Sequence, residues 1–464
     1  RVQIGGPTGA FVIIVYNGIA QYGYDGMLLA TFMAGFMLIF AGYARFGQVI
    51  KFIPHPVITG FTAGIAVIIA SSQINDFFGL GINNIPADFI PKWMMYLTHF
   101  QAMHLPSLAI GLIALALIVL TRRFTPKLPS YLIAVVVTAL LVALFNIPTA
   151  TIGSHFPNIP TGIPMPSLPD ISFERMHEVL PLALTIAFLA GIESLLSAVI
   201  ADGMTGFKHR SNQELIGQGV ANIASTLCGG MPATGAIART VTNVKSGGTT
   251  PIAGLFNAVF ILLFMLCASD YMSFVPMAAL AAILFVVAWG MSEIHHVIHI
   301  LKQSGSDRLI LLLTFSLTVL VDLTTAIAVG VILASLIFMR EMSKAVVITD
   351  EAETNQRTDL PKGVEVFRIS GPLFFPVVDE LLDMLQSIGQ VPKILILRMS
   401  RVPFLDGTGV STIVNLVNDF HAKGTRVILS GAQNQPREFL NRANVKNLHF
   451  TENYLDAIKL AETI

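Results

Sequence analysis

The sequence predicts an α-helical polytopic membrane protein followed by a small α/β domain, and three observations support this. Hydrophobic residues make up 54% of the chain and charged residues only 12%, a balance typical of chains that lie largely in lipid. The motif Gly-Gly-Pro-Thr-Gly-Ala at residues 5–10 returns as Gly-Gly-Met-Pro-Ala-Thr-Gly-Ala at residues 229–236. After Met342 the chain turns polar and then alternates between strand-like and helix-like patterns. The predicted division is a membrane domain at 1–342, a linker at 343–360 and a soluble domain at 361–464.

Apolar segments long enough to enter a bilayer recur throughout the predicted membrane domain. They lie near residues 25–43, 57–79, 106–121, 129–147, 177–201, 251–268, 275–292, 309–322 and 326–340. Shorter apolar segments accompany the two motif copies, at residues 7–20, 213–228 and 237–244. Together they predict about a dozen membrane segments.

Lysine and arginine are divided unevenly between the two sets of alternating loops. One set holds most of them, from Arg45 near the start to Lys344 at the end, whereas the other holds only Lys92 and Arg175. Because basic loops stay on the cytoplasmic side, the first set predicts the cytoplasmic face of an inner membrane. The soluble domain follows a helix that ends on this face, so we expect it in the cytoplasm.

The soluble domain alternates strands with helices. Val364–Ile369, Ile394–Met399 and Arg426–Ser430 have the pattern of buried strands. Residues 377–388, 410–422 and 435–442 have the pattern of amphipathic helices. This order predicts helices packed over a sheet.

The two motif copies predict broken helices inside the membrane. Gly and Pro interrupt a helix there only where the freed backbone groups are buried in protein or line a wet cavity. A short helix that starts after each break directs its free N–H groups into that cavity, where they favour an anion. The candidate N–H donors are Thr8, Gly9 and Ala10 at the first break, and Gly235, Ala236 and Ile237 at the second. The alternative is that these glycines only allow close helix packing.

Two charged residues lie within otherwise apolar membrane segments. Glu193 is in the middle of the segment at 177–201, where a carboxylate is costly without a partner or a function. Arg239 follows the second break by three residues, where its charge would add to the helix dipole and attract an anion. The alternatives are a structural ion pair or packing hydrogen bond for Glu193, and simple neutralisation of Glu193 by Arg239. Thr234, Thr240 and Thr242 are expected to make local backbone or packing contacts.

Several classes of function are excluded by composition and motifs. The 28 basic residues balance the 28 acidic ones, which leaves no electrostatic footprint for nucleic acid. The sequence contains no phosphate-binding loop of the Gly-x-x-x-x-Gly-Lys-Ser/Thr kind, so an ATP-driven pump is not expected. It also shows no nucleophile and base arrangement typical of an enzyme.

Three stretches resemble a known family: Arg-Phe-Gly at residues 45–47, Pro-Val-Ile-Thr-Gly-Phe-Thr-Ala-Gly at 56–64, and Ser-Asn-Gln-Glu-Leu-Ile-Gly-Gln-Gly-Val-Ala-Asn at 211–222. They are similar to the sulfate permease (SulP) family of anion transporters, and the C-terminal module resembles its STAS domain. The resemblance implies seven plus seven inverted segments, split into a core and a gate. Two helices are then expected before Arg1.

The resemblance also implies roles for particular residues. It places an acidic residue at Glu193 beside the substrate, serving sodium in some members and a proton in others, with Ser197 one turn later as a hydroxyl ligand. Family members often have Ser-Arg where this chain has Ala238 and Arg239. In the soluble domain, Asp406 and Thr408 lie where STAS relatives carry a phosphorylated Asp-Ser-Ser-Gly loop, but Gly407 replaces the first serine. We interpret this loop mainly as a helix start.

The resulting expectation is a secondary transporter that moves a small anion inward with a cation by an elevator-like movement. Sulfate is the first choice, followed by C4-dicarboxylates such as succinate or fumarate, and then bicarbonate. Alternatives are an uncoupled exchanger or channel, and a membrane-anchored regulator. No cofactor is expected beyond sodium as a coupling ion. The expected partners are the anion, the lipid bilayer, a second copy in a homodimer and a cytosolic protein bound by the STAS domain.

Overall fold

The computed structural model describes residues 2–9, 11–48, 53–86, 88–126, 128–156, 165–267, 269–303, 305–350, 361, 363–386, 391–445 and 448–463. The chain divides into two compact units, Arg1–Ile332 and Leu333–Ile464.

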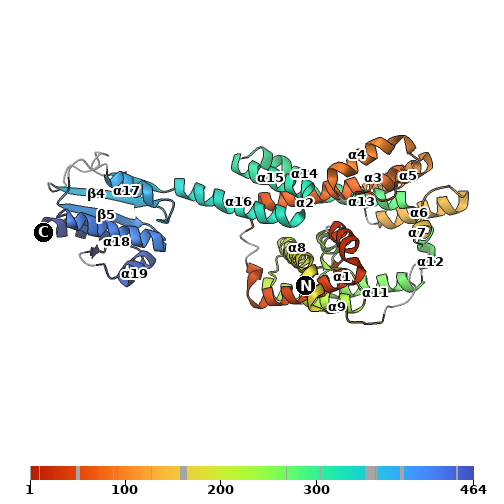
Figure 1. Cartoon of the computed structure of the whole chain (residues 1–464), viewed down its shortest axis with the longest axis horizontal. Coiled ribbons are helices and arrows are strands. Elements are labelled where there is room, and N and C mark those ends of the chain that lie inside the picture. The colour runs from red at the N-terminus through yellow and green to blue at the C-terminus, as the bar shows by residue number, and fades with distance from the viewer. Residues whose placement is uncertain are drawn as a thin grey trace. The chain divides into compact units, whose positions relative to one another are not determined.

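The first unit is helical, as the apolar segments predict (Figure 1). Its helices are α1 Phe11–Tyr43, α2 His55–Ser72, α3 Ile74–Phe78, α4 Phe89–His99, η2 Phe100–Ala102, α5 Leu105–Phe124, α6 Ser130–Phe145, α7 Ile152–His155, α8 Phe173–Thr205, α9 Ser211–Leu227, α10 Ile237–Lys245, α11 Ile252–Cys267, α12 Ser269–Met272, α13 Met277–Met291, α14 Ile294–Leu301, α15 Gly305–Leu320 and the start of α16 Leu323–Lys344. Among the described residues, 6 helical stretches are long and apolar enough to cross a membrane. The predicted segments at 213–228, 237–244 and 309–322 form the shorter helices α9, α10 and α15.

Helix α1 joins two predicted segments, 7–20 and 25–43, into one stretch of 33 residues with a kink. The kink lies at Gly23, whose φ of 73° and ψ of 176° are not helical. A side chain would make this conformation costly, so glycine allows the chain to change direction here.

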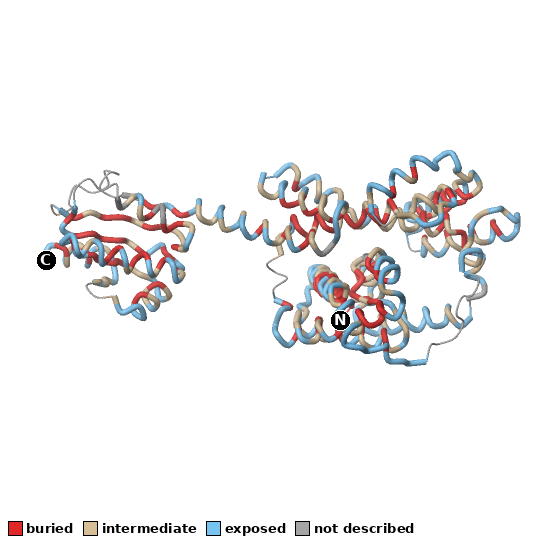
Figure 2. Tube along the Cα trace, viewed as in Figure 1, coloured by how far each residue is buried: buried red, intermediate tan, exposed pale blue. Residues whose placement is uncertain are grey.

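The helices of the first unit pack in two groups (Figure 1). We call α1, α8, α9 and α10 the crossover bundle, because it contains both broken segments. We call α2, α3, α5, α6, α13, α14 and α15 the flanking bundle. Figure 2 shows buried residues concentrated where helices of a bundle meet, with exposed residues on their outer faces. Many of these exposed residues are large and apolar, as on a surface that faces lipid.

The two motif copies meet as a pair of short strands. β1, Gly5–Gly6, pairs antiparallel with β2, Thr234–Gly235, with Gly5 opposite Gly235 and Gly6 opposite Thr234. Helix α1 starts five residues after β1, and α10 starts directly after Ala236. The breaks at corresponding positions of the two halves therefore cross each other.

The second unit is a five-stranded sheet in the order β3-β4-β5-β6-β7, with β3 antiparallel and the others parallel. Its elements are β3 Val347–Asp350, β4 Val364–Ser370, α17 Val378–Gln386, β5 Ile394–Arg401, α18 Gly407–Ala422, β6 Arg426–Ser430, α19 Asn434–Arg442, β7 Leu448–Thr451 and α20 Tyr454–Thr463. The six elements expected from the sequence are all present. The structure differs at β3, which lies inside the stretch 343–360 expected to be a linker and forms an edge strand instead.

Alternating side chains of the sheet supply two apolar layers. Val366 and Ile396 pack with Ala457 and Ala461 of α20 on one face. On the other face, alternate residues of the same strands pack with α17, α18 and α19. Burial on both faces explains the near-continuous apolar strands.

Candidate functional site

The crossing of the two broken segments is the centre of the candidate site. Beyond the β1–β2 pairing, the Ala236 N–H donates to Ile4 O at 2.9 Å, and the Ile4 N–H donates to Thr240 Oγ1 at 3.0 Å. Ser197 Oγ of α8 donates to the same threonine oxygen at 3.1 Å. These bonds join the start of the chain, α8 and α10 into one network.

Glu193 lies on α8 next to the first break. Its Oε2 accepts a hydrogen bond of 2.8 Å from Thr8 Oγ1. Among the described residues, no Lys, Arg or His lies within ion-pair distance of its carboxylate. Within the described part of the chain, the site therefore holds a half-buried carboxylate whose one hydrogen-bond partner is a hydroxyl, leaving acceptor capacity for a proton or a cation.

Arg239 lies on α10 and reaches back to the first break. Its Nη2 donates to the carbonyl oxygen of Pro7, and a Cβ added at Gly6 would be 2.9 Å from its Nη1. Among the ion pairs of the described residues none joins Arg239 to Glu193, so the structure does not support the alternative in which Arg239 only neutralises Glu193. The physical reason is that the guanidinium bonds to backbone across the crossing instead.

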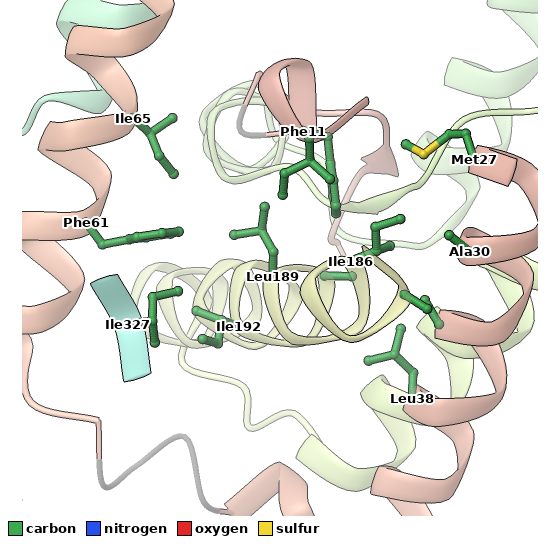
Figure 3. Packing of buried hydrophobic residues seen from close by; sticks show 14 of the residues in the cluster. Phe11, Met27, Ala30, Leu38, Phe61, Ile65, Ile186, Leu189, Ile192 and Ile327 are labelled. Carbon is green, nitrogen blue, oxygen red and sulfur yellow. The ribbon is translucent and has the colours of Figure 1, made fainter. Parts of the chain in front are cut away.

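A small cavity of about 20 Å³ adjoins Glu193, room for about one water molecule. Its walls come from α8 and α10 on one side, and from α2 and α16 on the other. Figure 3 shows the apolar packing around it, with Phe61 of α2 and Ile327 of α16 directed toward Leu189 and Ile192 of α8. Glu193 is the only charged residue among those lining this cavity. The carboxylate is thus placed where the crossover bundle meets an apolar wall.

The predicted N–H donors lie in different surroundings. Ile237 lines the cavity as the first residue of α10, where the helix leaves N–H groups without intrahelical partners. Ala236 differs from expectation, because its N–H is already bonded to Ile4. Gly9 packs against Ile69 and Met291, 3.6 Å from where its Cβ would be, which supports the packing alternative there.

The remaining predicted residues are divided among other positions. Gly235 lies against the side chain of Gln3, while Ala238 lies on α10 with its side chain outside the described part. Ala10 lies outside the described residues. Ser197 is fully buried and bonds Thr240, so the structure does not bring its hydroxyl to Glu193 as expected. The short serine side chain has a nearer partner on α10.

Sequence reasoning missed the residues that hold the crossing in place. Thr234 and Thr240 make contacts far along the chain, since Thr234 Oγ1 donates to Ala190 O of α8 at 2.8 Å. Local backbone contacts or packing contacts were expected for these two threonines, and the contacts observed are packing hydrogen bonds to partners distant in the sequence. Gln3 Nε2 donates to Ser194 O at 3.0 Å, and Asn243 Nδ2 to Val2 O at 2.8 Å. These partners are separated by up to 241 residues, so only the fold reveals them.

The loop predicted at Asp406 is a helix start, as expected. Asp406 is the N-cap of α18, and its Oδ1 accepts from the Gly409 N–H at 2.7 Å. Its Oδ2 accepts from the Phe375 N–H at 3.2 Å, which ties the loop to the segment after β4. Thr408 is exposed in the first turn.

A resident metal site is not apparent from side-chain clusters. In the described part of the chain, no group of three or more His, Cys, Asp or Glu residues could hold a metal ion. The oxygens that could contact a monovalent cation at the crossing are those of Glu193 and Thr8.

The chain is similar to known families and proteins over most of its length. Residues 1–314 match the model of the sulfate permease family, and residues 355–457 match the STAS domain. The chain is 41% identical to a putative sulfate transporter of Bacillus subtilis, YvdB, over 96% of this chain and 84% of that protein. It is 29% identical to the bicarbonate transporter BicA of Synechocystis, over 95% of this chain and 81% of that protein.

Solved structures share the fold. The murine solute carrier 26 family member A9 anion transporter, in an inward-facing state, superposes with a TM-score of 0.87 at 16% identity, covering 100% of this chain and 84% of that one. The transmembrane domain of a cyanobacterial BicA superposes with a TM-score of 0.60 at 27% identity, covering 72% and 84%. This is a multi-pass membrane protein of a family of transporters, not enzymes. The chain belongs to the sulfate permease family of anion transporters and carries a C-terminal STAS domain.

Proposed function

We propose that this protein carries a small anion, with sulfate as the first candidate, across the cytoplasmic membrane together with a proton or a sodium ion. The observation that supports the proposal most directly is the position of Glu193. It faces the small cavity beside the start of α10, and it accepts a hydrogen bond from the Thr8 hydroxyl. A carboxylate in a membrane-spanning helix is costly, and proton or cation binding gives it a function.

The anion would bind next to this carboxylate, at the crossing of the broken helices. The first N–H groups of α10 and the Arg239 guanidinium offer positive charge there. Binding a cation at Glu193 would remove the repulsion between the carboxylate and the anion, which gives coupling a physical basis. We propose an elevator-like displacement of the crossover bundle along the apolar wall formed by α2 and α16.

Bicarbonate is the second candidate substrate, because the chain is 29% identical to a bicarbonate transporter over 95% of its length. A C4-dicarboxylate stays a further alternative, since Ala238 replaces an expected hydroxyl residue. We also propose that the protein forms homodimers and that the STAS domain lies in the cytoplasm and binds a cytosolic protein, as the resemblance and the basic loops imply.

The test is uptake of labelled sulfate, succinate and bicarbonate into proteoliposomes containing the full-length protein. An inward proton gradient and an inward sodium gradient are imposed separately. Glu193→Gln keeps the side-chain shape and removes the charge, and Glu178→Gln on the exposed face of the same helix is the matched control. We expect gradient-driven uptake of one anion that Glu193→Gln abolishes and Glu178→Gln leaves intact.

Two other outcomes would contradict the proposal. Uptake that is indifferent to both gradients and unchanged in Glu193→Gln would favour an exchanger or channel. Absence of uptake for all three anions would reject them as substrates.

A further inference from the structure

Helix α9 carries a polar stripe that reaches both broken segments. Glu214, Gln218 and Asn222 recur every four residues, which places them on one face of the helix. Asn222 is fully buried and Gln218 is 8% exposed. Buried amides are costly unless they are hydrogen-bonded, so the partners of this stripe indicate its role.

At the second break, the stripe holds the backbone of Ala233 from both sides. Gln218 Nε2 and Asn222 Nδ2 donate to Ala233 O at 2.5 Å and 2.9 Å. The Ala233 N–H donates to Asn222 Oδ1 at 2.9 Å. Ala233 directly precedes β2 and lies three residues before Ala236, the N-cap of α10. The stripe thereby sets where α10 begins.

At the first break, the stripe acts through one intermediate residue. Glu214 Oε1 accepts from Ser194 Oγ at 2.6 Å. Ser194 O and Oγ accept in turn from Gln3 Nε2, at 3.0 Å and 3.2 Å. Gln3 lies two residues before β1, so the same helix face fixes both strands of the crossing.

We propose that Glu214, Gln218 and Asn222 are positioning residues that set the placement of the two broken segments relative to each other. They would thereby set the geometry in which the anion meets the start of α10 and Arg239. Apolar side chains would pack α9 equally well, and only hydrogen bonds fix a backbone at one register. This inference rests on the proposed anion site.

The test compares Asn222→Ala and Gln218→Met with Thr226→Val in the full-length protein. Thr226 is a matched control, because it is 1% exposed on the same helix and its hydroxyl, among the described residues, bonds to carbonyls of its own helix, at Asn222 and Ile223. One readout is the KM and Vmax of uptake of whichever of sulfate, succinate and bicarbonate the unchanged protein transports. The other, which needs no substrate, is hydrogen–deuterium exchange over residues 231–240.

We expect Asn222→Ala to raise KM about tenfold, from the loss of buried hydrogen bonds. Gln218→Met should raise KM less, because Asn222 still holds Ala233. Both should speed exchange over residues 231–240, whereas Thr226→Val should change neither readout. If Asn222→Ala does not fold, the comparison of Gln218→Met with Thr226→Val decides.

The inference is overturned if the two stripe variants lower only Vmax, or if Thr226→Val raises KM as much as they do. Unchanged exchange over residues 231–240 would overturn it whatever the substrate is. Failure of the unchanged protein to transport any of the three anions would instead count against the proposed function.

Discussion

The two broken segments have the same motif but are held by different means. The second break is held by its neighbouring helix α9, through the paired bonds of Asn222 to Ala233. The first break is held mainly from the other half of the chain, by Thr240 at Ile4 and by Arg239 at Pro7. The second segment is therefore positioned by its neighbouring helix, and the first segment is positioned by hydrogen bonds to the second.

At each break, a glycine leaves room for a side chain from the other half of the chain. Gly6 of the first break leaves room for the Arg239 guanidinium, and Gly235 of the second leaves room for the amide of Gln3. Each glycine thus accommodates a residue from the opposite half. The repeated glycines therefore permit a reciprocal close approach, in addition to breaking the helices.

The largest expected effect comes from removing the Arg239 side chain, which links the two breaks. Arg239→Met should lower anion uptake roughly 10- to 100-fold, because it removes both a charge for the anion and the bond to Pro7. Arg239→Lys keeps the charge but loses the planar fork, so we expect an intermediate rate. Initial rates in proteoliposomes measure this. A methionine variant with unchanged KM and Vmax would show that Arg239 takes no part in anion binding.

A second prediction tests the reciprocal glycines. Gly6→Ala should lower uptake about tenfold, because the φ of 141° at this position is strained for alanine and its Cβ would displace Arg239. Gly5→Ala is the control, since the added Cβ would be 3.7 Å from Thr234 O, an ordinary contact. Uptake rates and thermal stability of both variants are compared. Equal losses in the two would contradict a specific role for Gly6.

A third prediction concerns the hydroxyl that the first break contributes to Glu193. Thr8→Val should shift the proton or sodium concentration that gives half-maximal uptake about fivefold, because the carboxylate loses the hydrogen bond from Thr8. Thr8→Ser keeps the hydroxyl, so the proton or sodium concentration at half-maximal uptake should be the same as in the unchanged protein. Uptake is measured against proton or sodium concentration. If Ser fails to rescue, the methyl group and not the hydroxyl is the important feature.

The sequence was sufficient to predict the longer membrane helices and the two broken segments, but not the helices α4 and α14. Gly and Pro inside apolar segments have few explanations in a membrane, so the breaks and their meeting point followed from local chemistry. The alternation of strands and helices likewise gave the soluble domain, apart from β3, β7 and α20. These lie at the two ends of the domain, where short and partly polar patterns give little signal.

The partners of the polar residues could not be predicted in the same way. A threonine within a helix, such as Thr240, is normally expected to bond to its own helix. Only the crossing of the segments brings Thr240 to Ile4, 236 positions away. The sequence does contain one signal of such partners, which is the spacing of Glu214, Gln218 and Asn222 by four residues. Such a stripe on a membrane helix indicates polar partners elsewhere in the fold.

The smallest expected effect lies outside the crossing, in the soluble domain. Asp406→Ala removes the N-cap of α18 and the bond to the Phe375 N–H, and should destabilise this domain by about 1 kcal/mol. Because no residue of the crossing is changed, we expect uptake to keep its KM. Hydrogen–deuterium exchange over residues 407–412 measures the first effect in the full-length protein, and Ser411→Ala, exposed on the same helix, is the control. A changed KM in Asp406→Ala alone would mean that the loop at Asp406 communicates with the anion site, a coupling for which the crossing itself has no need.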